Sequence, residues 1–580
     1  MKRTLSMLAA LALVACALAQ PAVAATPDTA TSRTVSGGGV IGYVDTTTGA
    51  HAWRAIPFAA PPVGDLRWRA PRPPAAWTGQ RTAVTAAPWC PQQLSALDGV
   101  EKARWGEIVG QEDCLYLDVY APPMTAQQAA GARLPVMMWI HGGSNTWGRA
   151  EQYDGSALAA RFKVVVVVVQ YRLGALGWMS LDALRQGGTL PDDASANFGT
   201  LDHIRALEWI ASDIGAFGGD ASRVTIFGES AGGHNVAALL ASPRAKGLFH
   251  RAIIQSGSFR SVPAAEAEGV TDSGPASATA VARRILGPGG AVQGPALRAA
   301  PLSALFGAYK TPDGQIDPLR VIADGVTLPE AGLSSGLDSP AAWNAVPVMT
   351  GANRDEVKLF HALNPEFVWR LFGVLPMARD QAYYDAASDY PSRMWRANAV
   401  DGPAARMVAG GQPAVWAYRF DWDEEGRVLF TDLGKLLGAG HSLEIPFVFG
   451  HFKLLGAFDR FAFTKGNAPG RIALSDAMMS YWVNFAATGA PGRGVKGDLP
   501  EWKAWSNASG AERIMLLDST AGGGARMSND LETRDRISTE LLADPRLKTP
   551  ARRCAVLTRT AWDTPELKPL VARECPGASQ

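Results

Sequence analysis

The sequence has little of what marks a nucleic-acid-binding, membrane-spanning or disordered protein. Its 580 residues include 55 Lys and Arg against 54 Asp and Glu, and no basic run is longer than a few residues. A nucleic-acid partner is therefore not expected, because it would need a concentrated positive face. Only 19% of the residues are charged and 47% are apolar, which excludes general disorder and favours a large buried core.

Internal repeats and obvious linkers are also missing. The Gly-, Ala- and Pro-rich stretch at 270–300 is short enough to be a surface excursion. We therefore expect one large domain over residues 25–545. A Pro-punctuated C-terminal extension, residues 546–580, follows it and holds two cysteines.

Residues 1–24 have the pattern of a signal peptide. Lys2 and Arg3 precede an apolar stretch, residues 5–18, that is too short to span a bilayer comfortably. An Ala-Val-Ala site follows, so we expect cleavage and a periplasmic or secreted protein. Acylation of Cys16 in a lipoprotein box is the alternative. No other stretch holds about 18 consecutive apolar residues, so no transmembrane segment is expected in the mature chain.

Cysteine is scarce, and its spacing is not that of a metal site. Cys90, Cys114, Cys554 and Cys575 remain after signal removal. No CxxC or clustered Cys/His pattern is present, so no metal is expected. An even cysteine count in an oxidising compartment predicts two disulfides, of three possible connectivities. We favour pairing near neighbours, 90 with 114 and 554 with 575, over four reduced cysteines.

Continuous apolar runs predict the strands of a mainly parallel sheet. Runs without alternation are typical of strands that are buried on both faces. They lie at 134–140, 164–169, 223–227, 252–255 and 346–350. Helical patterns at 200–214 and 231–240 lie between them, and this alternation predicts a doubly wound α/β fold.

Two segments match Gly-x-Ser-x-Gly, and their surroundings differ. Ser230 directly follows a β-branched run and precedes an Ala/Gly-rich segment that can begin a helix. A nucleophile elbow needs this strand–turn–helix setting, because small flanking residues let the backbone turn sharply and expose the hydroxyl. Ser334 follows no predicted strand and is expected in a loop. Ser230 is therefore the predicted nucleophile.

A serine nucleophile needs a histidine base, and in this fold the chain order is serine, acid, histidine. The histidines that follow Ser230 are His234, His250, His361, His441 and His451. His441 is favoured, since it lies in a Gly-rich loop before an apolar segment. His451 is the alternative, although we expect it to end that segment as a surface residue.

The acid and the oxyanion hole are predicted from strand ends. Asp355 and Glu356 follow the strand at 346–350, and since adjacent side chains point to different sides, only one can face the histidine. Spacing alone leaves both open. The predicted oxyanion hole consists of backbone amides that can crowd a developing negative charge. They belong to Gly142, Gly143, Ser144 and Ala231.

Several long segments, in the right order, resemble the type-B carboxylesterase/cholinesterase family and cover most of the chain. Residues 217–233 resemble its serine signature and residues 112–120 its second signature. Shorter matches lie at 56–64, 171–174, 254–257 and 481–485. The resemblance implies an α/β-hydrolase catalytic domain with helical insertions around the central sheet.

The resemblance also implies a serine hydrolase of small-molecule carboxylic esters that works through an acyl-enzyme without metal or organic cofactor. It maps the acid onto Glu356, which makes Asp355 a neighbour, and it maps the histidine onto His441. It maps the family's first disulfide onto Cys90 and Cys114. A catalytically silent binding module is the alternative from another class. Within enzymes, a lipase, a thioesterase or an amidase acting on a specialised polar substrate stays open.

Three residues depart from the family pattern. Ser144 replaces a glycine of the oxyanion loop, so its side chain would narrow or re-polarise the hole. Asn145 replaces an aromatic residue and would make the pocket mouth more polar. Val357 replaces the glycine after the acid and could shift the loop that carries Glu356. The sequence identifies neither the physiological ester nor the oligomeric state.

Overall fold

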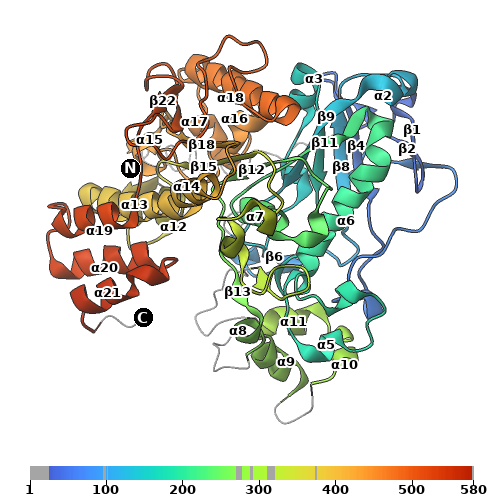
Figure 1. Cartoon of the computed structure of the whole chain (residues 1–580), viewed down its shortest axis with the longest axis horizontal. Helices are drawn as coiled ribbons and strands as arrows, with labels where there is room; N and C mark the ends of the chain where they lie inside the picture. The colour runs from blue at the N-terminus through green and yellow to red at the C-terminus, as the bar shows by residue number, and fades with distance from the viewer. Residues whose placement is uncertain are drawn as a thin grey trace, which may run out of the picture.

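The computed structural model of the protein describes residues 25–95, 100, 102–269, 277–287, 292–309, 321–371 and 375–577. The expected signal peptide and Cys16 lie outside the described residues. A mixed 11-stranded sheet forms the centre (Figure 1). In spatial order its strands are β22 (Arg526–Ser528), β21 (Ile514–Leu517), β18 (Val415–Phe420), β15 (Val348–Asn353), β12 (Arg251–Gln255), β11 (Gly219–Glu229), β9 (Leu134–Ile140), β10 (Val165–Val169), β8 (Tyr116–Ala121), β4 (His51–Pro57) and β3 (Tyr43–Val44).

Neighbouring strands from β21 to β10 are parallel, and the antiparallel pairs lie at the two edges of the sheet. The predicted mainly parallel sheet is therefore confirmed. The run at 134–140 is β9 itself, and the run at 223–227 is the end of a longer strand, β11. The strand expected at 346–350 begins after Pro347 and extends to Asn353, nearer to the acidic pair.

Both faces of the sheet are buried, as the continuous apolar runs predict. Alternate side chains of β10 enter two different cores, Val165, Val167 and Val169 on one face and Val166 and Val168 on the other. Helices α6 (Phe198–Asp213) and α7 (Ala231–Ala241) cover the first face, and α13 (Gln381–Arg396), α16 (Ile445–Phe449) and α18 (Ala468–Thr488) cover the second. The central strands therefore have no solvent-facing side.

Further helices and short strand pairs surround this centre. The helices are α2 (Ala126–Ala132), α3 (Ser156–Phe162), α4 (Gly174–Gly177), α5 (Asp182–Arg185), α8 (Ala264–Glu268), α9 (Ala278–Leu286), α10 (Gly294–Arg298), α11 (Leu302–Ala308), α12 (Lys358–Leu363), α14 (Gly402–Ala409), α15 (Leu433–Leu436) and α17 (Asp459–Ala462). The short strands are β1 (Arg33–Val35), β2 (Gly38–Ile41), β5 (Gln80–Thr82), β6 (Gln92–Gln93), β7 (Ile108–Val109), β13 (Val262–Pro263), β14 (Ile322–Ala323), β16 (Val368–Leu371), β17 (Leu375–Ala378), β19 (Arg427–Val428) and β20 (Thr431–Asp432). Helices α8 to α11 gather below the sheet as one of the expected helical insertions (Figure 1).

The C-terminal segment packs into the second core. It comprises α19 (Arg534–Ala543), α20 (Pro550–Ala561) and α21 (Lys568–Glu574), drawn in red beside α13 in Figure 1. Val556 and Leu557 of α20 are buried in the same core as the sheet residues. No helix among the described ranges is both long and apolar enough to cross a membrane.

Two disulfides are present, in the near-neighbour pairing. Cys90 bonds to Cys114 across 24 positions, with 5.1 Å between their Cα atoms. Cys554 bonds to Cys575 across 21 positions, with 5.5 Å between the Cα atoms, and joins α20 to the end of α21. Each bond closes a short loop, so each restricts its own segment and neither ties distant parts of the chain together.

A buried ion pair supports the loop that follows β10. The Arg172 guanidinium donates to Asp202 of α6 at 2.6 and 2.8 Å, and both side chains are almost fully buried. Arg172 also donates to the backbone carbonyl of Arg69 at 2.8 Å. Two buried charges in bidentate contact neutralise each other, so the loss of one leaves the other uncompensated.

We predict that Asp202→Ala lowers the free energy of unfolding by about 3–5 kcal/mol, because it leaves the Arg172 charge buried without its partner. Denaturant unfolding followed by circular dichroism measures this change. The matched control on the same helix is Glu208→Ala, since Glu208 is half-exposed and its pair with Arg205 is worth less than about 1 kcal/mol. Equal losses in the two variants would contradict the prediction.

Candidate active site

Ser230 lies on a sharp turn between β11 and α7. Its φ of 58° and ψ of −123° are strained for a residue with a side chain, at a cost of about 1–3 kcal/mol. A Cβ added to Gly232 would lie 1.9 Å from the Ile140 carbonyl oxygen, so only glycine allows this approach to the end of β9. Ser230 therefore has the strand–turn–helix setting that its sequence predicts.

The second Gly-x-Ser-x-Gly match has no such geometry. Ser334 lies in a short 3-10 turn, Leu333–Gly336, and the segment before it is not a strand. The Ser334 carbonyl accepts a hydrogen bond from Arg406 at 2.8 Å. Its backbone is thus used structurally, and the turn does not present the hydroxyl on an elbow.

His441 and Glu356 meet although 85 positions separate them. The His441 Nδ1–H donates to Glu356 Oε2 at 2.6 Å, and both side chains are buried. Glu356 Oε1 accepts from the Ser256 hydroxyl at 2.5 Å and from the Asn353 backbone N–H at 2.7 Å. The carboxylate is thus held in one orientation, with one oxygen left for the imidazole.

The neighbouring acid, Asp355, points elsewhere. Its carboxylate pairs with Arg354 at 2.8 Å and with Lys358 at 3.2 Å. Burial opposes ionisation of Asp355, but these two cations outweigh burial and lower its pKa. The structure therefore brings Glu356, and not Asp355, to the histidine.

The second ring nitrogen of His441 contacts Glu229, the residue before Ser230. His441 Nε2 lies 3.1 Å from Glu229 Oε1, which also accepts from the Ser442 hydroxyl at 2.8 Å. Burial raises the pKa of Glu229 to about 8. Burial disfavours the charged imidazolium, but Glu229 and Glu356 outweigh it and raise the pKa of His441 to about 9.

A third buried carboxylate, Glu444, completes the cluster. It accepts from Gln255 Nε2 at 3.1 Å and from Asn353 Nδ2 at 2.7 Å. Burial raises the pKa of Glu444. The donors come from the ends of β12 and β15, so the sheet itself supplies the hydrogen bonds that keep this acidic group buried.

The glycine-rich loop after β9 lies against the elbow. A Cβ added to Gly142 would come within 3.1 Å of the Ser230 Cβ. Gly143, Ser144 and Asn145 have φ values of 99°, 53° and 59°, so three consecutive residues adopt the left-handed conformation. Ser144 and Ser230 line the same cavity, which places this loop where the sequence predicts the oxyanion hole.

The other two departures from the family pattern are accommodated without strain at the acid. Asn145 lines the same cavity as Ser230, and its Oδ1 accepts from Asn235 of α7 at 2.9 Å, so it adds a polar group to the cavity wall. Val357 has a φ of −81°, which requires no glycine.

The alternative histidine, His451, is half-buried, not a surface residue, and its Nε2 accepts from the Asp154 backbone N–H at 3.4 Å.

Ser230 opens onto a cavity of about 1280 Å³. Two aromatic residues of its lining, Phe360 and Trp395, contact the His441 ring, with ring centroids 5.3 and 4.9 Å away. Trp395 Nε1 donates to the Gly257 carbonyl at 3.2 Å, which holds the indole in place. Among the described residues, no group of three or more His, Cys, Asp or Glu side chains could hold a metal ion.

This sheet, with a serine elbow at its centre, defines the α/β-hydrolase fold. The carboxylesterase family model matches residues 29–371 and 377–535. The chain therefore belongs to the carboxylesterase family, and it is a serine hydrolase of carboxylic esters.

Similar proteins include other esterases. The para-nitrobenzyl esterase of Bacillus subtilis (strain 168) is 33% identical over 525 residues, which cover 85% of this chain and 95% of that protein. The fumonisin B1 esterase of Sphingopyxis macrogoltabida is 33% identical over 543 residues, covering 88% and 90%. A solved structure of PNB esterase superposes with a TM-score of 0.68 at 32% identity, covering 88% of this chain and 99% of that one.

Sequence reasoning missed the groups that orient the acid and flank the base. Glu229 occupies the first x of the Gly-x-Ser-x-Gly motif, which the motif leaves open. Its contact with His441 joins the end of β11 to a loop far along the chain. Ser256 has a φ of 49°, and the matched segment at 254–257 was the available signal for it. Asn353 donates through both its backbone and its side chain. None of these contacts follows from local periodicity.

We predict that Glu229→Gln lowers the pKa of His441, because it removes an anion 3.1 Å from Nε2. A serine hydrolase needs the neutral imidazole, so kcat/KM rises with pH through this pKa, and its acid limb should move to lower pH in the variant. The kcat/KM–pH profile for an aryl ester measures this. Glu266→Gln, an exposed position on α8, is the matched control. An unmoved acid limb in Glu229→Gln would count against the assigned contact.

Proposed function

We propose that Ser230, His441 and Glu356 act as a catalytic triad in ester hydrolysis. The observation that carries this proposal is the 2.6 Å hydrogen bond between His441 Nδ1 and Glu356 Oε2, beside the elbow that presents Ser230. A carboxylate on Nδ1 fixes the tautomer in which Nε2 is the free base. The backbone amides of Gly143, Ser144 and Ala231, together with the Gly142 turn, form the oxyanion hole of this proposal.

The reaction proceeds in two acyl transfers. The Ser230 Oγ attacks the ester carbonyl carbon while its proton passes to His441 Nε2, and the imidazolium then protonates the departing alcohol. Water attacks the acyl-enzyme and loses a proton to Nε2, and the imidazolium returns this proton to the Ser230 Oγ as the carboxylic acid leaves. In this scheme His441 Nε2 exchanges its contact with Glu229 for one with the Ser230 hydroxyl. The residues required are all in the chain, and no cofactor enters the scheme.

The catalytic unit in this proposal is residues 25–545, with 546–580 as an extension stapled by the Cys554–Cys575 bond. Two disulfides support an oxidising compartment, so we infer that the chain is exported to the periplasm or secreted. The substrate is a small-molecule carboxylic ester. The names of the relatives, a nitrobenzyl esterase and a fumonisin esterase, support a family that accepts very different ester groups.

We predict that Ser230→Ala lowers kcat for 4-nitrophenyl acetate by about 10⁴-fold or more, because it removes the nucleophile while the turn and the core stay in place. Covalent labelling by an organophosphonate, detected by mass spectrometry, should also disappear. The matched control is Ser334→Ala in the second Gly-x-Ser-x-Gly segment, which should stay within about threefold of wild type. Turnover that survives Ser230→Ala would overturn the proposal.

A further inference from the structure

The C-terminal helices extend beyond the part of the chain that the family model matches. That match ends at residue 535, whereas the structure continues through α19, α20 and α21 to residue 577. The disulfide between Cys554 and Cys575 closes α20 against α21. Residues 536–577 therefore lie outside the family match, and their position in the structure suggests a role in the site.

The turn that joins α20 to α21 forms part of the wall of the active-site cavity. Residues 559–560 and 562–567 line the same cavity as Ser230 and Ser144. A segment outside the family match thus shares a cavity with the nucleophile. The cavity, at about 1280 Å³, exceeds the usual range of about 300–1,000 Å³ for small-molecule sites.

This turn, residues 562–567, is fixed to the body of the enzyme by polar contacts. Asp563 Oδ1 pairs with Arg260 at 2.6 Å, and Glu566 pairs with Arg534 at 3.0 Å. Thr564 is 1% exposed and its hydroxyl accepts from Asn398 Nδ2 at 2.8 Å. The carbonyl of Arg260 contacts His234 Nε2 at 2.6 Å, on the helix that leaves the elbow. The turn and the elbow are therefore linked through a short chain of contacts.

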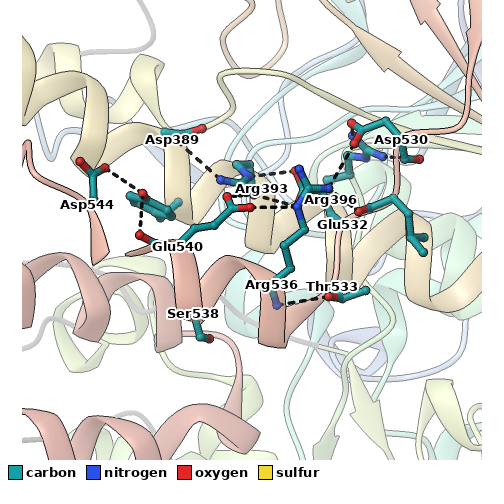
Figure 2. A network of polar contacts seen from close by, with 12 residues as sticks. Asp389, Arg393, Arg396, Asp530, Glu532, Thr533, Arg536, Ser538, Glu540 and Asp544 are labelled. Carbon is teal, nitrogen blue, oxygen red and sulfur yellow. Dashed lines mark hydrogen bonds and ion pairs between the residues drawn. The ribbon is translucent and has the colours of Figure 1, made fainter. Parts of the chain in front are cut away.

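Ion pairs also connect neighbouring parts of the C-terminal segment to the rest of the chain. Figure 2 shows Arg393 and Arg396 of α13 reaching the carboxylates of Glu532 and Asp530, just before α19 begins. On α20, Arg559 pairs with Glu366 at 2.6 Å. Contacts of this kind on rigid elements place a side chain more accurately than a free loop does.

Trp562 is the side chain that this arrangement presents. It is 69% exposed, although it lines the cavity, and it follows directly after the last residue of α20. When a second ring or an apolar group covers aromatic surface that water contacts, the free energy of the system falls. The charged residues on either side of it in the lining, Arg559 and Asp563, give the same wall hydrogen-bonding groups.

We propose that the 562–567 turn is a substrate-specificity element and that Trp562 is its specificity-determining residue. It binds the distal part of esters whose acyl or alcohol group carries a ring several bonds away from the scissile carbonyl. The inference rests on the proposed function, since it needs Ser230 to open this cavity to the ester. The inference adds a substrate class to that function, namely esters long enough to reach from Ser230 to the 562–567 turn.

The test compares three esters: 4-nitrophenyl acetate, a 4-nitrophenyl ester with a phenyl-ended acyl chain, and a phenyl-ended alkyl acetate. In Trp562→Ala, kcat/KM for one of the two phenyl-ended esters should fall about tenfold relative to kcat/KM for 4-nitrophenyl acetate. The loss should come mainly from a higher KM. An aromatic contact of 0.5–1.5 kcal/mol corresponds to about two- to tenfold. The ester that responds shows whether the acyl or the alcohol group faces the turn. Trp562→Phe should restore most of the ratio.

The matched control is Trp105→Ala, because Trp105 is 45% exposed and is not part of the cavity lining. Its ratios should stay at the wild-type values. Unchanged ratios for both ring-bearing esters in Trp562→Ala, or an equal loss on all three esters, would overturn the specificity role. Failure of the proposed function gives a different result, namely hydrolysis of all three esters that survives Ser230→Ala.

Discussion

Strands that are buried on both faces favour apolar side chains along their length, and the polar groups of this site lie at the ends of such strands. This constraint organises the whole molecule. Ser230 follows β11, Gln255 ends β12, Asn353 ends β15, and Gly142 follows β9. These strands are parallel neighbours, so their carboxyl ends meet at one edge of the sheet. The polar groups of the site gather at this edge, where the loops that follow the strands supply hydrogen-bond partners such as Ser256.

The same constraint explains the electrostatics of the site. Glu229, Glu356 and Glu444 are three buried carboxylates around one imidazole, an arrangement that would be unfavourable without donors. Most donors come from the strand ends and the loops after them: Ser256 and Asn353 hold Glu356, and Gln255 and Asn353 hold Glu444. Ser442, between α15 and α16, holds Glu229. His441 thus lies among acidic groups, of which Glu229 and Glu356 contribute most to its raised pKa.

The chain outside the sheet decides the shape of the space above the serine. Phe360 and Trp395 bring aromatic surface to the His441 ring from helices that cover the second face. The α20–α21 turn closes the same cavity from a segment beyond the family match. The reacting groups lie at the ends of the central strands, while helices and turns outside the sheet supply the walls of the cavity, so relatives can share chemistry and differ in substrate.

Much of the fold and the nucleophile could be predicted from the sequence, because burial and turn chemistry are local. The runs at 134–140 and 164–169 predict strands buried on both faces, and Ser230 stands between a β-branched run and a small-residue helix start. The cysteine spacing favours the pairing that the structure forms. Spacing alone left Asp355 and Glu356 equal, and only the family resemblance pointed to Glu356.

The sequence by itself determined which residues form strands, where the backbone must turn at Ser230, and which family the chain resembles. The tertiary structure decided which acid faces His441, that Glu229 contacts its other nitrogen, and that Trp562 lines the cavity. The physical reason is the range of the interactions. Periodicity and turn preferences act over a few residues, whereas each of these contacts joins segments that only the finished sheet and its covering helices bring together.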